Sequence, residues 1–171
     1  MTAVTSHSAA RGRWLGLAAL LWAIDQAIKF GVVQTMQLHD SVAVFPGFNW
    51  VYVLNPGAAF SFLADAGGWQ RYFFTSIAFA VSAVLAVLLW RGVASRLEAL
   101  AYTLLMAGAL GNAADRLHTG AVVDYLDVYW RAWHWPAFNA ADVYVSVAAL
   151  MLIAGAWRPA ARPAPGQTPS R

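Results

Sequence analysis

The sequence predicts an all-α integral membrane protein with four transmembrane helices, a small extracytoplasmic β-sheet or hairpin, and a short interfacial helix. The first observation behind this prediction is composition: the 171 residues are 60% hydrophobic and only 11% charged. Soluble domains carry roughly 25% charged residues, so this chain has too little charge to cover a surface that faces water. The second observation is that long apolar runs, typical of helices that cross a bilayer, alternate with short segments that carry most of the arginines.

The composition also excludes several classes of function. The chain has no cysteine, which rules out disulfide bonds, thiol catalysis, thiolate metal sites and a thiol–disulfide oxidoreductase. The net charge is +3, but the basic residues flank apolar runs instead of clustering on one polar face. This distribution is typical of membrane topology and does not indicate nucleic-acid binding.

Residues 14–33 form the first predicted transmembrane helix, because about 20 apolar residues are enough to cross the bilayer. Arg11 and Arg13 precede the run as in a signal peptide, but no small-x-small cleavage site follows it. Asp25 and Lys29 lie four residues apart on one helix face, with the acid first, which is the favourable order for an ion pair. We expect this pair to support the structure by letting two charges tolerate the membrane.

Residues 38–60 are predicted to form an extracytoplasmic β region. The segments 41–45 and 48–54 are rich in β-branched and aromatic residues, and Pro46-Gly47 separates them. Open strand edges do not occur within hydrocarbon, so this region is expected at the membrane surface.

A loop of small residues, Asn55-Pro-Gly-Ala-Ala-Phe60, follows the hairpin. It is either a simple turn or a place where a backbone or a ligand approaches closely, and the sequence favours neither. Residues 61–68 are expected to form the short interfacial helix.

Three further apolar runs, at residues 72–90, 97–117 and 139–157, complete the predicted bundle. Residues 1–157 are therefore expected to form one membrane-embedded domain, followed by a disordered, Pro-rich cytoplasmic tail at 158–171. The arginines on one side of the four spans are Arg11, Arg13, Arg91, Arg96, Arg158 and Arg162. By the positive-inside rule, this side and both termini are cytoplasmic, and residues 118–137 lie outside with the β region. An aromatic belt at the outer membrane surface is expected from Tyr125, Tyr129, Trp130, Trp133 and Trp135.

Four of the eight acidic residues lie between residues 108 and 142, namely Asp115, Asp124, Asp127 and Asp142. The predicted topology brings all four to the extracytoplasmic surface, whereas a transporter site is expected near the middle of the bilayer. The residues that share a face near the outer end of the third helix are Asn112, Asp115 and Arg116. Gly108 and Gly111 on the same helix allow a neighbouring helix to approach closely.

Each of these polar groups also has a purely structural explanation. Asn139 and Asp142 have the spacing of a capping box at the start of the fourth helix. Asp115 beside Arg116 indicates a buried ion pair. The residues interpreted as interfacial are His118, Asp127 and His134.

The chemistry open to the chain is narrow. It has no His-Glu-x-x-His zinc motif, its four histidines are scattered, and it has no Gly-x-Ser-x-Gly motif. Two carboxylates that lie close together can nevertheless hydrolyse a peptide bond, because they cannot both ionise and therefore share a proton. One takes a proton from the attacking water, while the other donates a hydrogen bond and later protonates the leaving nitrogen.

Five motifs, which cover most of residues 14–157, carry a resemblance to a known family. They are Asp25-Gln-x-x-Lys29, Asn55-Pro-Gly-Ala-Ala-Phe60-Ser61, Gly111-Asn-Ala-Ala-Asp-Arg116, Gly120-Ala-Val-Val-Asp124 and Phe138-Asn-Ala-Ala-Asp142. In these motifs and their order, the sequence resembles the lipoprotein signal peptidases (signal peptidase II), the aspartic peptidase family A8 of the bacterial inner membrane. Tyr125 stands where that family more often has Phe.

The resemblance implies an endopeptidase that removes the signal peptide from a prolipoprotein, cleaving before a cysteine that already carries diacylglycerol. By motif position, the catalytic pair is Asp124 and Asp142. The residues expected to support the site or bind substrate are Asn55, Gly57, Asn112, Asp115, Arg116, Asn139, Asp25 and Lys29. The resemblance further implies no cofactor, inhibition by the cyclic peptide globomycin, and an active site near the extracytoplasmic surface. The expected partners are the precursor and membrane lipids, without nucleic acid, and the chain is expected to be a monomer.

Two other interpretations make different predictions. A small four-helix proton-coupled transporter would carry an acid near the middle of a span, and its transport would depend on a proton gradient. A non-catalytic membrane scaffold would not depend on any single aspartate.

Overall fold

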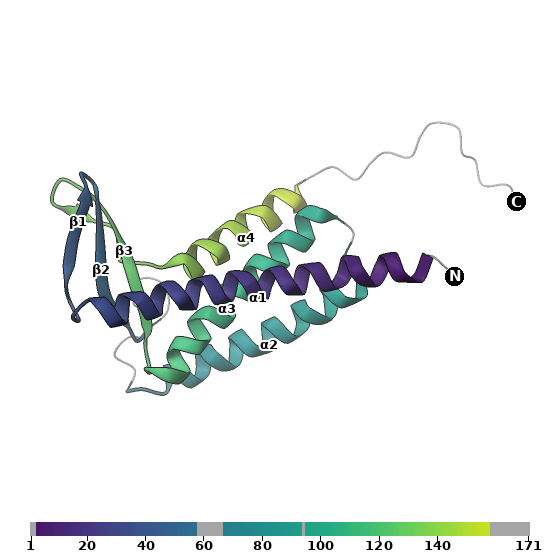
Figure 1. The fold of residues 1–171 in the computed structure, drawn as a ribbon, viewed down its shortest axis with the longest axis horizontal. Coiled ribbons are helices and arrows are strands. Elements are labelled where there is room, and N and C mark those ends of the chain that lie inside the picture. Colours follow the sequence, from purple (N-terminus) through teal and green to yellow (C-terminus); the bar gives the residue numbers. More distant parts are fainter. Residues whose placement is uncertain (1–2, 58–66, 94, 158–171) are drawn as a thin grey trace, which may run out of the picture.

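A computed structural model describes residues 3–57, 67–93 and 95–157, and shows a mostly helical chain with a small antiparallel sheet across one end (Figure 1). The helices are α1 (Ala3–Thr35), α2 (Gln70–Arg91), α3 (Arg96–His118) and α4 (Ala140–Ala156). The strands are β1 (Ser41–Phe45), β2 (Phe48–Asn55), β3 (Val122–Trp130) and β4 (Trp133–His134), paired in that order. The predicted interfacial helix at 61–68 lies almost wholly outside the described residues, and so does the predicted tail at 158–171.

All four predicted helices are present, and the largest difference in their ends is at the start of α1. Helix α1 begins at Ala3, well before the predicted span, which starts at residue 14. Three helices are long and apolar enough to cross a membrane, namely Gly12–Thr35 within α1, α2 and α3. Helix α4 is apolar but has only 17 residues.

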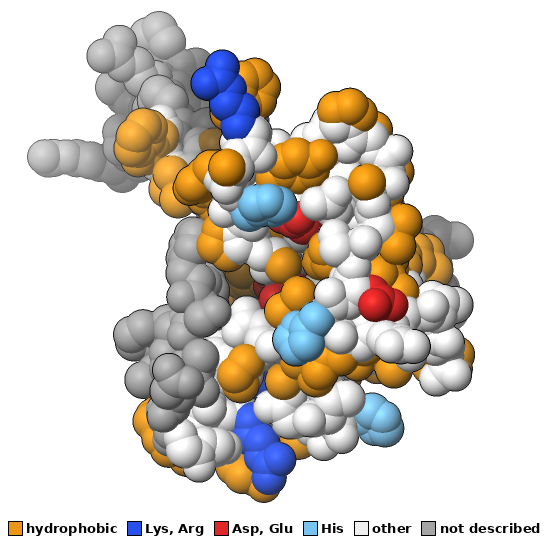
Figure 2. Space-filling model, turned by 90° about the vertical axis from the view of Figure 1, so that its left-hand side faces the viewer, with side chains coloured by type: hydrophobic (Ala, Val, Ile, Leu, Met, Phe, Trp, Pro, Cys, Tyr) orange, Lys and Arg blue, Asp and Glu red, His pale blue; other side chains and the backbone are white. Residues whose placement is uncertain are grey.

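The outer surfaces of the helices are apolar. Large hydrophobic side chains of α2 that are about half exposed or more include Tyr72, Phe79, Val84 and Trp90. Apolar patches of this extent are rare on soluble monomers and suit a lipid environment. The sheet end of the molecule differs, since histidine and acidic side chains lie there among hydrophobic ones (Figure 2).

Helix α3 packs against each of the other three helices, and its two glycines allow close approach. A Cβ atom at Gly108 would collide with the carbonyl oxygen of Ala141 in α4. A Cβ atom at Gly111 would lie 2.5 Å from the Oδ2 atom of Asp25 in α1. The predicted role of Gly108 and Gly111 is therefore confirmed, and these contacts bring polar side chains of α1, α3 and α4 together.

The predicted β-hairpin is confirmed, with Pro46 and Gly47 at the turn between β1 and β2. Gly47 has a φ of +92°, a left-handed conformation that glycine adopts without strain. Strand β3 was not predicted. It pairs antiparallel with β2 and places Asp124 opposite Val53, so the sheet carries one of the two predicted catalytic aspartates.

A small apolar core anchors the sheet on the end of α1. Val32 of α1 packs with Val123 and Tyr125 of β3, and the Tyr125 ring lies 4.9 Å from that of Trp50. Tyr125 is only 2% exposed, so its predicted place in an interfacial aromatic belt is wrong. The belt residues that are exposed are Trp130, Trp133 and Trp135.

Candidate active site

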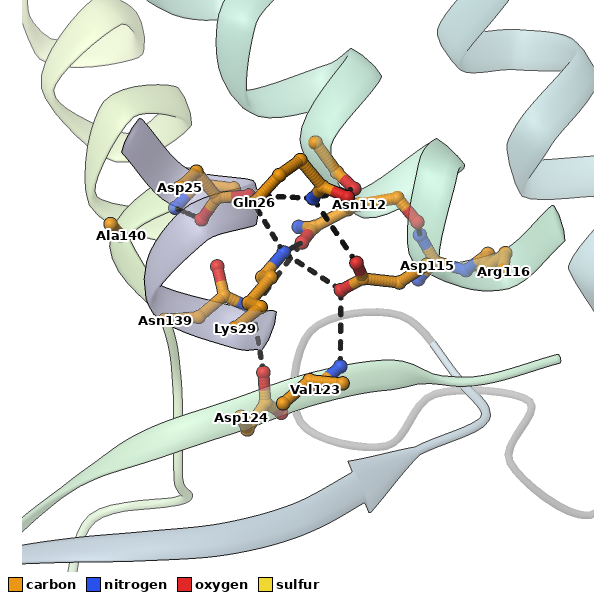
Figure 3. A network of polar contacts seen from close by, with 12 residues as sticks. Asp25, Gln26, Lys29, Asn112, Asp115, Arg116, Val123, Asp124, Asn139 and Ala140 are labelled. Atoms are coloured by element: carbon orange, nitrogen blue, oxygen red, sulfur yellow. Dashed lines mark hydrogen bonds and ion pairs between the residues drawn. The ribbon is translucent and has the colours of Figure 1, made fainter. Parts of the chain in front are cut away.

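The structure joins all ten predicted site residues in one network of hydrogen bonds and ion pairs at the sheet end of the helices. Figure 3 shows the part of this network around Lys29, with Asp124 and Asn139 beside it. They come from α1, the end of β2 and the loop after it, α3, β3 and the start of α4. The network has two parts, a buried charged cluster and a pair of aspartates beside it.

Lys29 is the centre of the charged cluster. Its Nζ atom lies 3.0 Å from Asp25 Oδ2, 2.8 Å from Asp115 Oδ2 and 3.0 Å from Asn112 Oδ1. Asp25 and Lys29 are 0% and 3% exposed, so the predicted pair at i and i+4 is confirmed and is fully buried. Buried charges are tolerated only when they are paired and hydrogen-bonded, and this cluster meets both conditions.

Asp115 forms its ion pair with Lys29, so the predicted Asp115–Arg116 pair is wrong. Consecutive residues on a helix do not face each other, and these two side chains point in different directions. Arg116 donates from Nη2 to the carbonyl oxygen of Gly57 at 2.6 Å and from Nη1 to the carbonyl oxygen of Asn112 at 3.3 Å. Its guanidinium also lies over the ring of Phe74, 5.2 Å from the centroid.

The two carboxylates of the charged cluster also bind backbone groups of other elements. Asp115 Oδ2 accepts a hydrogen bond from the backbone N of Val123 at 3.1 Å, which ties β3 to α3. Asp25 Oδ1 accepts one from the backbone N of Ala141 at 3.1 Å, which ties α4 to α1. The cluster therefore positions the two segments that carry Asp124 and Asp142.

Gln26 belongs to this cluster although sequence reasoning gave it no role. Its Nε2 atom lies 3.2 Å from each of Asp25 Oδ2, Asp115 Oδ1 and the carbonyl oxygen of Gly111. Its position in the sequence could have indicated this role, because Gln26 lies three residues before Lys29 and therefore on the same helix face.

Asn139 links the two predicted catalytic aspartates. Its Nδ2 atom donates to Asp124 Oδ1 at 2.7 Å. Its Oδ1 atom accepts from the backbone N of Asp142 at 3.0 Å, and Asp142 Oδ2 accepts from the backbone N of Asn139 at 3.2 Å. The predicted capping box is thus confirmed, and the residue that caps α4 also contacts Asp124.

The two aspartates lie in different surroundings. Asp124 is 2% exposed, and burial, followed by the negative charge of Asp142, raises the pKa of Asp124 to about 7. The amides of Asn139 and Asn55 act in the opposite direction without cancelling this rise in the pKa. Asp142 is partly exposed, lies in the first turn of α4, and accepts a 2.7 Å hydrogen bond from Asn112 Nδ2. A helix N-terminus and amide donors favour a negative charge there.

The loop after β2 begins beside Asp124. Asn55 Nδ2 lies 3.2 Å from Asp124 Oδ2, and Asn55 Oδ1 accepts from the backbone N of Gly57 at 3.0 Å. Gly57 is buried and accepts the hydrogen bond from Arg116. The first residues of this loop are therefore oriented by side chains of the network, and residues 58–60 lie outside the described part of the chain.

The sequence indicated that Asp127 is an interfacial residue, but in the structure its side chain is buried and has polar partners. It is 8% exposed, accepts a 2.8 Å hydrogen bond from Asn49 Nδ2, and lies 2.9 Å from His134 Nδ1. His134 is about half exposed and His118 is exposed, in agreement with their predicted surface positions. In residues 3–57, 67–93 and 95–157, no three His, Asp or Glu side chains are grouped as a metal site.

A family model described as signal peptidase (SPase) II matches residues 17–158. A lipoprotein signal peptidase of Aeromonas hydrophila is 48% identical over 155 residues, covering 90% of this chain and 93% of that protein. One from Serratia marcescens is 50% identical over 139 residues, covering 81% of each chain. Two structures described as bacterial membrane enzymes, solved by the in meso method at 2.3 and 1.9 Å, superpose with TM-scores of 0.75 and 0.74. They are 31% and 29% identical and cover 85% and 87% of this chain, and 87% and 95% of their own.

Proposed function

The chain belongs to the signal peptidase II family of bacterial membrane proteins, and we propose that it is an aspartic endopeptidase acting on prolipoproteins that already carry diacylglycerol. It removes the signal peptide by cleaving immediately before the lipid-modified cysteine. The family supports signal-peptide removal, and the observation that supports the aspartic mechanism is the link that Asn139 forms between Asp124 and Asp142.

In the proposed mechanism the two aspartates have different roles. Asp124 carries the proton in the resting state, because burial and the charge of Asp142 raise its pKa to about 7. Asp142 is the general base and takes a proton from the water that attacks the scissile carbonyl carbon. Asp124 donates a hydrogen bond to the carbonyl oxygen as it gains negative charge. The leaving nitrogen receives a proton from the pair as the C–N bond breaks.

Residues around the pair are proposed to position the substrate and the aspartates. Asn139 and Asn112 orient Asp124 and Asp142, respectively, by 2.7 Å hydrogen bonds. Asn55 and Gly57 form the edge of the loop nearest the scissile bond, and Arg116 positions that loop through the Gly57 carbonyl.

The charged cluster is proposed to support the site without touching the substrate. Asp25, Lys29 and Asp115 are buried, and they connect α1 to the start of α4 and to β3. The cluster thereby sets the distance between two segments that are separate in sequence.

The proposed topology has four spans, with α4 crossing the membrane despite its 17 helical residues. The end of the bundle that carries Arg91 and Arg96 is cytoplasmic together with both termini, and the sheet end is extracytoplasmic. A lipid-anchored cysteine presents its scissile bond at the outer leaflet, which is the level of Asp124 and Asp142 in this topology. The enzyme acts as a monomer without a cofactor.

The test is incubation of the purified chain in detergent or vesicles with a diacylglyceryl-modified precursor, scored by product size and by the N-terminal residue of the mature fragment. We expect cleavage before the modified cysteine, and inhibition by globomycin. A precursor without diacylglycerol is the matched control and is expected to stay intact. Equal cleavage of both precursors would contradict the proposed substrate class.

A further inference from the structure

The end of the bundle away from the sheet has a cavity that no step of the proposed reaction uses. It has a volume of about 440 Å³ and is lined by Arg13, Trp14 and Leu17 of α1 and by Arg96 of α3. Figure 1 shows this end, where the N-terminal part of α1 and the start of α3 both lie far from the sheet. Arg13 is the second residue of the candidate span Gly12–Thr35, so the cavity lies at a membrane surface.

Two small buried residues bring the arginines of α1 and α3 near one another. Ala18 and Ala99 are 3% and 2% exposed and belong to the same core cluster, against which Trp14 also packs. Helices α1 and α3 pack against each other, and the short side chain of alanine allows two helices to approach closely. Arg13, within α1, and Arg96, the first residue of α3, line the same space.

These two guanidinium groups have no acidic partner in the part of the chain that the structure describes. Arg13 lies over the ring of Trp14, 5.1 Å from its centroid, which orients one guanidinium at the cavity wall. Glu98, the acid nearest to Arg96 in sequence, accepts a 2.7 Å hydrogen bond from the Tyr102 hydroxyl and forms no ion pair. Two like charges that share a cavity repel each other, and an anion between them would relieve the repulsion.

We propose that this cavity binds the phosphodiester headgroup of an anionic phospholipid in the leaflet at this end of the bundle. Guanidinium groups bind phosphate oxygens through paired hydrogen bonds, and tryptophan is enriched at the headgroup level of membranes. The two arginines bind the phosphate, and Trp14 covers one side of the headgroup. Two positive charges on one site select a lipid of net negative charge over a zwitterionic one.

The apolar surface next to the cavity supports a lipid in preference to a soluble phosphate. Leu17, Leu20 and Ile24 follow one another at spacings of three and four residues and therefore form a single stripe along α1. Leu20 and Ile24 are 56% and 42% exposed. An acyl chain attached to a headgroup in the cavity would cover this stripe, which a free phosphate would leave exposed.

The test uses the full-length protein in detergent micelles with equal amounts of phosphatidylglycerol and phosphatidylcholine, and native mass spectrometry counts the lipid adducts. We expect the wild type to retain phosphatidylglycerol preferentially. The double variant Arg13→Gln/Arg96→Gln is expected to lose roughly 30-fold in affinity for phosphatidylglycerol, because each arginine contributes a factor of about five. Arg91→Gln is the matched control, because Arg91 lies at the same end of the bundle and does not line the cavity.

Three results would overturn the proposal. The first is equal phosphatidylglycerol retention by the wild type and the double variant. The second is an equal loss in Arg91→Gln, because binding would then depend on the overall positive charge of this surface. The third is displacement of phosphatidylglycerol by glycerol phosphate at the same concentration as the lipid. The phosphate group alone would then account for binding, and the acyl chain would contribute nothing. Cleavage of the precursor by the double variant confirms that it is folded, and the single variants Arg13→Gln and Arg96→Gln replace it if it does not fold.

Discussion

The side chain of Asn139 donates a 2.7 Å hydrogen bond to Asp124, while its own backbone and side chain cap α4, which carries Asp142 in its first turn. One asparagine thus sets both the start of α4 and the orientation of a carboxylate on β3. Asn112 adds a second link, since its Nδ2 atom binds Asp142 and its Oδ1 atom lies 3.3 Å from Asn139 Nδ2. The relative placement of the two aspartates therefore depends on two amide side chains.

Replacement of Asn139 by alanine is expected to reduce both stability and cleavage. Loss of an N-cap costs about 1 kcal/mol of unfolding free energy, and Asp124 also loses its shortest hydrogen bond. Ser95→Ala is the matched control, because Ser95 caps α3 through Glu98 at the other end of the bundle. Thermal unfolding and precursor cleavage are measured for both variants. We expect both variants to lose a similar amount of stability and only Asn139→Ala to lose kcat. Equal kcat in the two variants would show that Asn139 does not position Asp124 for cleavage.

Replacement of Asp115 by asparagine is expected to lower the unfolding free energy by about 3 kcal/mol, because it removes one of two carboxylates paired with buried Lys29. Activity is expected to fall as well, since Asp115 anchors β3 at Val123. Lys29→Met removes the partner of Asp115. The double variant should therefore lose less unfolding free energy than the two single variants lose in sum. Wild-type thermal stability together with complete loss of turnover would instead assign Asp115 a catalytic role.

Stability and activity are both expected to depend on the protonation of Asp124. Its pKa is about 7 in the folded protein and 3.8 ordinarily, so the folded state binds the proton more tightly than the unfolded state. The resulting stabilisation is fully present below about pH 4 and is lost as the pH rises to about 7. Cleavage that requires protonated Asp124 should likewise decline as the pH rises through about 7. Asp124→Asn should remove this part of the pH dependence of the melting temperature between pH 4 and 8, and an unchanged profile would refute the assignment.

Tyr125 makes a hydrogen bond that a phenylalanine cannot make. Its hydroxyl accepts from the backbone N of Ala140, at 3.0 Å, at the first residue of α4. Tyr125→Phe should therefore lower the unfolding free energy by about 1 kcal/mol. Tyr129→Phe serves as the control, because the Tyr129 ring stacks on His134 near the surface. Chemical denaturation of the two variants is compared, and equal midpoints would show that the Tyr125 hydroxyl contributes nothing.

The fold was predictable where one local pattern dominates. The four apolar runs, the hairpin at Pro46-Gly47 and the capping box of Asn139 each depend on residues within a few positions of one another. Strand β3 was missed because Asp124 and Asp127 interrupt its apolar residues, and its aromatic residues also suit a membrane surface. Both acids are buried through contacts with residues distant in sequence, including Asn55 and Asn49, which no local pattern contains.

The sequence indicates which charged residues lie near the site, but it does not indicate which of them form ion pairs with one another. The sequence places Asp115 next to Arg116, but the fold brings Lys29 from another helix to Asp115 across the close contact that Gly111 permits. Gln26 completes the same cluster from the same face of α1. Spacing along the chain also could not select Asp124 and Asp142 over Asp115, and that choice came from the resemblance of the five motifs to a known family.

Single-turnover cleavage of a diacylglyceryl-modified precursor by Asp124→Asn and by Asp142→Asn tests whether these two aspartates form the catalytic pair. The control is Asp40→Asn, since Asp40 is exposed near the sheet and its carboxylate accepts a hydrogen bond from the backbone N of Gln37. We predict that each catalytic variant stays folded and membrane-inserted but loses roughly 10²–10⁴-fold in rate, while Asp40→Asn cleaves at the wild-type rate. Normal cleavage by either Asp124→Asn or Asp142→Asn would show that the two aspartates are not the catalytic pair.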